Sequence, residues 1–118
     1  MENAVLDRAL LFLGGEISDE GRARLEKLCS MAVSQLENRL KAGESADSLG
    51  ELFVSAAGIL ALSMYAALGN EDFSSVKIGS VTLTRNGGSM VPELRKLSEE
   101  LLSGCLREKG FVFKGVRG

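Results

Sequence analysis

The apolar residues in the first third of the chain recur at helical spacing. A short apolar stretch followed by a pair of glycines predicts a helix over about residues 2–13, because paired glycines end helices. Over about residues 19–41, apolar side chains follow one another at intervals of three and four, the period of one helix face. Ser18 is a typical N-cap, and the dipole of the helix favours the acids Asp19 and Glu20 in its first turn. These patterns predict a short helix and then a long amphipathic one.

The next segment is apolar on every side. From Leu52 to Leu68 the chain carries no charge, and this length lies at the lower edge of what a bilayer requires. Its flanks are acidic at Glu51 and Asp72 and hold no basic cluster that would set an orientation in a membrane. We therefore predict a central buried helix over about residues 49–68 rather than a membrane span.

The period then changes from helical spacing to alternation over about residues 74–85. Gly79-Ser80 suits the two central positions of a type II′ turn, which predicts a β-hairpin. With this turn, Ile78 lies opposite Val81 and Val76 lies opposite Leu83. The apolar side chains on one face of the hairpin are then Val76, Ile78, Val81 and Leu83.

A last helix and a terminal strand complete the predicted fold. Pro92 opens a leucine-rich stretch that predicts a helix over about residues 92–108. Aromatic and β-branched residues then predict a short strand over about residues 111–114. The expected fold is mainly α: one domain over residues 1–118, with a small bundle of four helices, a β-hairpin between the third and fourth helices, and a C-terminal strand.

Composition excludes many kinds of function. The 118 residues include 14 Lys and Arg against 16 Asp and Glu, a net charge of −2 that gives no electrostatic reason to bind nucleic acid or an anionic membrane. The chain has no His, which removes the commonest metal ligand and the commonest general base. Cys29 and Cys105 lie on predicted apolar stripes with no metal-binding spacing, as expected of free thiols in a reducing cytoplasm. The N-terminus is not basic and does not resemble a signal peptide.

No motif predicts a catalytic, cofactor or metal site. Gly87-Gly88-Ser89 stands between a strand and a helix, but it lacks the Lys-Ser/Thr of a phosphate-binding loop. The acidic pairs are adjacent in sequence, and neighbouring residues of a helix do not converge on a substrate. We therefore expect no enzymatic activity and no cofactor.

The hairpin offers the strongest candidate for function. A two-stranded ribbon needs a cover for its apolar face, and its edges can template another strand. The cover can come from the same chain or from a hairpin or tail of a second copy, and the sequence leaves both open. The candidate interface residues are Val76, Ile78, Val81, Leu83, Phe111 and Phe113.

Five segments carry a resemblance to a known family. They are a helix ending in Leu13-Gly14, a long helix from Ser18 to Leu40, an apolar helix ending near Tyr65, the hairpin around Gly79, and a leucine-rich helix that runs into Gly110-Phe111-Val112-Phe113. This order resembles the small head-tail connector, or head-completion, proteins in the necks of tailed phages and prophages.

The resemblance implies a structural subunit. Copies would form a ring beneath the portal, receive the tail and let DNA pass, with the candidate interface residues in contacts between subunits or with the portal. The sequence also allows a small helical adaptor or regulator that binds a single protein partner through an exposed helix face. An enzyme that uses Glu or Ser alone is the remotest alternative.

Overall fold

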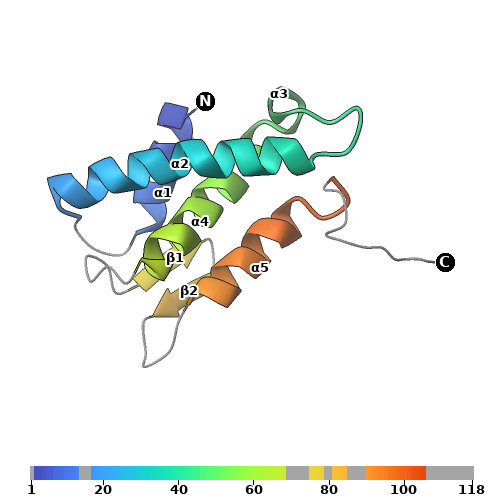
Figure 1. Cartoon of the computed structure of the whole chain (residues 1–118). Helices are drawn as coiled ribbons and strands as arrows, with labels where there is room; N and C mark the ends of the chain where they lie inside the picture. The colour runs from blue at the N-terminus through green and yellow to red at the C-terminus, as the bar shows by residue number, and fades with distance from the viewer. Residues whose placement is uncertain (1, 14–16, 69–74, 79–80, 85–89, 106–118) are drawn as a thin grey trace.

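A computed structural model describes residues 2–13, 17–68, 75–78, 81–84 and 90–105. The elements in chain order are α1 (Glu2–Phe12), α2 (Asp19–Arg39), α3 (Ala46–Leu49), α4 (Glu51–Ala67), β1 (Ser75–Ile78), β2 (Val81–Thr84) and α5 (Val91–Leu101) (Figure 1). The predicted fold class is confirmed: the protein is mainly helical, with an antiparallel hairpin between its last two long helices.

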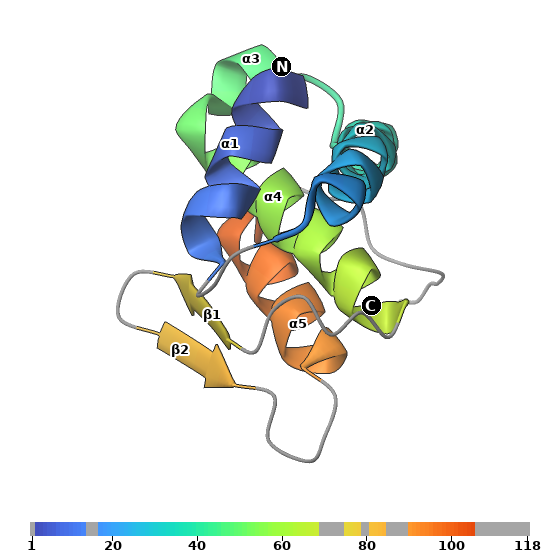
Figure 2. The same cartoon turned by 90° about the vertical axis from the view of Figure 1, so that its left-hand side faces the viewer.

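Helix α4 forms the centre of the molecule and contacts α1, α2, α3 and α5 (Figure 2). Its largest side chains, among them Phe53, Ile59 and Tyr65, are fully buried. A helix that carries no charge after Glu51 is stable here because its neighbours cover most of its circumference. In the part of the chain that the structure describes, no helix has both the length and the hydropathy needed to cross a membrane.

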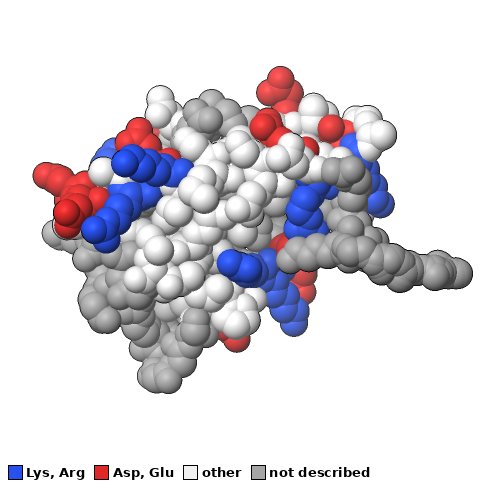
Figure 3. Space-filling model, viewed as in Figure 1, with Lys and Arg blue, Asp and Glu red and all other residues white. Residues whose placement is uncertain are grey.

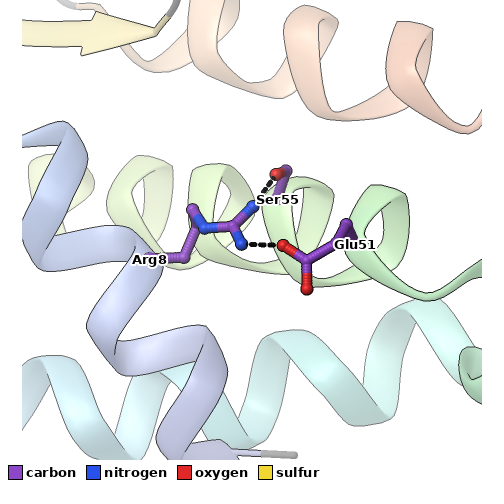
Figure 4. A network of polar contacts seen from close by, with 3 residues as sticks. All are labelled: Arg8, Glu51 and Ser55. Atoms are coloured by element: carbon purple, nitrogen blue, oxygen red, sulfur yellow. Dashed lines mark hydrogen bonds and ion pairs between the residues drawn. The ribbon is translucent and has the colours of Figure 1, made fainter.

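Helix α1 packs closely against α4 because Gly58 has no side chain. A Cβ atom added at Gly58 would lie 3.4 Å from the backbone nitrogen of Ala9 and 3.5 Å from the carbonyl oxygen of Val5. On the same pair of helices, Arg8 donates hydrogen bonds to the Glu51 carboxylate and the Ser55 hydroxyl (Figure 4). Close backbone contact and this polar bridge together fix the position of α1.

The long helices follow the sequence prediction to within two residues at their starts, and α3 was not predicted. The Ser18 hydroxyl accepts a hydrogen bond from the Gly21 N–H at 3.0 Å, which confirms the predicted N-cap. Between the helices predicted over about residues 19–41 and 49–68, Ser45 and Ser48 form a reciprocal capping box that starts α3. The usual sequence signal for this motif has Glu or Gln in place of Ser48, so residues 45–48 do not match it.

Helix α5 ends earlier than predicted. The prediction extended to about residue 108, but the helix ends at Leu101 and turns follow. Gly104 adopts φ +90°, a left-handed conformation that favours glycine, and the chain bends there. The Cys105 carbonyl then accepts a hydrogen bond from the Lys41 N–H at 2.9 Å, on the side of α2. Residues 106–108 and the predicted strand over residues 111–114 lie outside the described residues.

The predicted register of the hairpin is confirmed. Ile78 pairs with Val81, and Val76 pairs with Leu83. The turn residues Gly79 and Ser80 lie outside the described residues. Leu13 forms an antiparallel bridge to Val76, so β1 lies between Leu13 and β2.

Candidate subunit interface

The inner face of the hairpin packs on its own helices. Val76 is fully buried in the core, and Ile78 and Leu83 are half-buried against that core. Lys77 and Thr82, on the other face, are exposed. Val76 therefore covers the helices of its own chain, whereas Ile78 and Leu83 keep part of their surface open.

The other three candidate residues are described only in part or not at all. Val81 is placed by its backbone pairing with Ile78. Phe111 and Phe113 lie outside the described residues.

The two edges of the hairpin differ. The outer edge of β1 is bridged by Leu13, whereas β2 pairs with β1 alone among the described residues. Hydrogen-bonded and non-hydrogen-bonded pairs alternate in an antiparallel hairpin, and the pair that closes a two-residue loop is hydrogen-bonded. The pair Ile78–Val81 closes this loop, so the N–H and C=O of Thr82 point to the outer edge of β2. Within the described ranges no strand pairs with that edge, so its outward groups can accept one.

A hollow of about 230 Å³ lies beside this edge, between β2 and α5. Leu83 and Leu97 supply its apolar part, and Glu93, Lys96 and Glu100 surround it with charge. We call this site the β2–α5 hollow; Figure 2 shows the hairpin beside α5. The hollow was not predicted from the sequence. The only trace of the hollow in the sequence is on α5, where the charged residues 93, 96 and 100 share one helix face with Leu97.

The opposite flank of α5 borders a second apolar surface, which we call the α2–α5 groove. Helices α2 and α5 diverge over the C-terminal half of α4, where Leu60 and Met64 are half-buried and Leu68 is 60% exposed (Figure 1). Met31 of α2 is 51% exposed, and helical spacing places it on the same side as Gln35, which lines this groove with Leu60. Figure 3 shows a broad uncharged surface across this face of the molecule.

The narrow end of the α2–α5 groove is closed by polar contacts between α2 and α5. Arg39 forms an ion pair with Glu99 at 3.7 Å, and the Lys41–Cys105 backbone hydrogen bond lies just beyond it. The described chain therefore ends on the α2 side of α5, away from the β2–α5 hollow.

The thiol of Cys29 is fully buried in the core. Burial, with a smaller contribution from Glu26, raises the pKa of the Cys29 thiol to about 12, so the thiol is protonated and inert at neutral pH. Cys29 and Cys105 are both free. Within the described ranges, no group of three or more Asp, Glu or Cys side chains is placed to hold a metal ion. The loop Gly87-Gly88-Ser89 lies outside the described residues.

Comparisons with known proteins leave the family open. No protein-family model, no curated protein and no solved structure matches the chain. The two surfaces beside α5 are therefore the candidate sites, and of these the β2–α5 hollow includes a strand edge.

Proposed function

We propose that this chain is a non-enzymatic structural subunit of a phage or prophage neck, which assembles as a ring that joins the portal to the tail. Its partners would be further copies of itself, the portal and other neck or tail proteins, with DNA as passing cargo. No cofactor or membrane takes part. The protein would act in the virion neck, or reside in the bacterial cytoplasm when an inactive prophage encodes it.

The observation that carries this proposal is the outer edge of β2 beside the β2–α5 hollow. An edge with outward N–H and C=O groups at Thr82 and an apolar hollow at its side is suited to receiving an extended segment of another chain. Such a contact joins two unlike surfaces, and a repeated contact of this kind closes into a ring when its rotation allows. The resemblance in element order to head-tail connectors supplies the biological setting.

The test is the mass of the purified protein by size-exclusion chromatography with light scattering, together with negative-stain electron microscopy. We expect annular particles with a mass many times the 12.6 kDa of the chain. Thr82→Pro removes the outward N–H of the β2 edge without touching the pairing with β1, and should reduce the particles to monomers. Thr82→Val keeps the N–H and serves as the matched control, which should assemble. A wild-type chain that stays monomeric at every concentration, with and without a portal, would overturn the proposal.

The α2–α5 groove favours a second function, an adaptor or regulator that binds one protein partner. Leu60 and Met64 lie on one face of α4, and Leu68 at its C-cap continues that face, the kind of surface on which an amphipathic helix docks. This alternative predicts a monomer or dimer whose partner binding is lost with Leu68→Asp and kept with Thr82→Pro. The ring predicts that self-assembly is lost with Thr82→Pro and kept with Leu68→Asp.

A further inference from the structure

We infer that the β2–α5 hollow receives the C-terminal segment 111–114 of a neighbouring copy, which adds to the outer edge of β2 as a third strand. This inference rests on the proposed ring and specifies the contact that would build it. The occupant is a named segment of the same sequence, and three properties of the chain select it.

The first property is the alternation of the segment. In an extended strand, Phe111 and Phe113 point to one face, and Val112 and Lys114 point to the other. A third strand beside β2 continues the inner face of the hairpin, on which Leu83 lies. The two phenylalanines would then lie over Leu83 and Leu97, in the apolar part of the hollow.

The second property is charge. Residues 106–118 carry four basic side chains and the single acid Glu108, a net charge of +3; since the whole chain carries −2, residues 1–105 carry −5. Two of the three charged residues around the hollow, Glu93 and Glu100, are acidic. In an extended strand Lys109 shares the face of Phe111 and Phe113, so an added strand turns a basic side chain towards this acidic rim.

The third property is where the described chain ends, and it favours a neighbour over the same chain. The Cys105 carbonyl is bound to Lys41 on the α2 side of α5, the side that also holds the Arg39–Glu99 ion pair. The hollow lies on the opposite flank, beside Leu97. Cys105, the last described residue, therefore lies on the flank of α5 away from the hollow of its own chain. Donation from each copy to the next is a contact between unlike surfaces, as a ring requires.

The experiment mixes two full-length variants, each defective in one half of the contact. Phe111→Ser combined with Phe113→Ser removes the donor, and Thr82→Pro removes the acceptor edge. Each variant alone should be monomeric, and an equimolar mixture should give a complex of twice the 12.6 kDa chain mass, because one intact donor meets one intact edge and no further contact is possible. Met31→Ser, which changes an exposed side chain of the α2–α5 groove, is the control and should assemble as the wild type does.

The possible outcomes separate this inference from the proposed function. Rings that persist in the double phenylalanine variant would overturn the inference and leave the ring intact. If the two monomeric variants do not combine on mixing, the inference is also overturned. If the wild type is monomeric as well, the result assigns the C-terminal segment to its own chain. In that last case the proposed ring fails together with the inference.

Discussion

Cys29 shows how one buried side chain makes stability depend on pH. Its thiol has a pKa of about 12 in the folded protein and an ordinary value of 9.0 when exposed in the unfolded chain. Between these values the unfolded state loses a proton that the folded state keeps, so deprotonation favours unfolding. We predict that this thiol lowers the free energy of unfolding as the pH rises above about 9, by about 1.4 kcal/mol for each further pH unit.

Urea unfolding at a series of pH values checks this prediction. Cys29→Ala removes the group, so the part of the decline that the wild type shows and this variant lacks belongs to the thiol. Alkylation gives an independent readout: Cys29 should resist iodoacetamide at pH 8 in buffer and react in denaturant. Rapid alkylation of the native protein at Cys29 would contradict the burial on which the argument depends.

At the scale of elements, Gly58 sets the distance between α1 and α4. A methyl group at this position meets the backbone of Ala9 at 3.4 Å, an ordinary but close contact. We predict that Gly58→Ala changes the free energy of unfolding by less than about 1 kcal/mol, because better helix propensity offsets the tight contact. Gly58→Leu has to displace the α1 backbone, and we expect it to lower the free energy of unfolding by about 1–3 kcal/mol.

Thermal and urea unfolding of the two variants measure this difference. Ala67→Leu, at the exposed end of the same helix, is the control for adding a leucine to α4 and should change the midpoint little. Displacement of α1 should also separate Arg8 from Glu51. Arg8→Met should therefore lower the free energy of unfolding less in the Gly58→Leu background than in the wild type. A fully stable Gly58→Leu variant would show that α1 does not pack closely here.

The elements also show what local sequence can specify. The register of the hairpin was predictable because the turn residues and the alternation of Val76 and Ile78 agree on one pairing. The end of α5 was not predictable, because Leu102 and Cys105 continue the helical spacing although the chain turns at Gly104. The β2–α5 hollow is lined by Leu83 of one element and Leu97 of another, an arrangement that neither local pattern contains. The α2–α5 groove likewise follows from the divergence of two helices, which the pattern of each helix does not determine.

At the scale of the whole molecule, the charge of the chain is divided unevenly, and assembly should depend on salt. The net charge of −2 is the sum of +3 on residues 106–118 and −5 on residues 1–105. If the segment of one copy lies against the acidic rim of the next, their attraction is screened as ionic strength rises, since the Debye length falls from about 10 Å at 0.1 M to about 3 Å at 1 M. Apolar burial of Phe111 and Phe113 is not weakened in this way.

We therefore predict that the concentration of half-assembly rises with NaCl between about 0.05 and 0.5 M, a range over which the Debye length shortens several-fold. Light scattering over a dilution series at each salt concentration measures it. Lys109→Gln should weaken assembly at low salt and flatten the salt dependence, whereas Lys77→Gln, on the outer face of the hairpin, should leave the slope unchanged. Assembly that strengthens with salt in the wild type and in both variants would mean that apolar contact alone joins the subunits, and would remove charge from the reasons for choosing the C-terminal segment as the occupant.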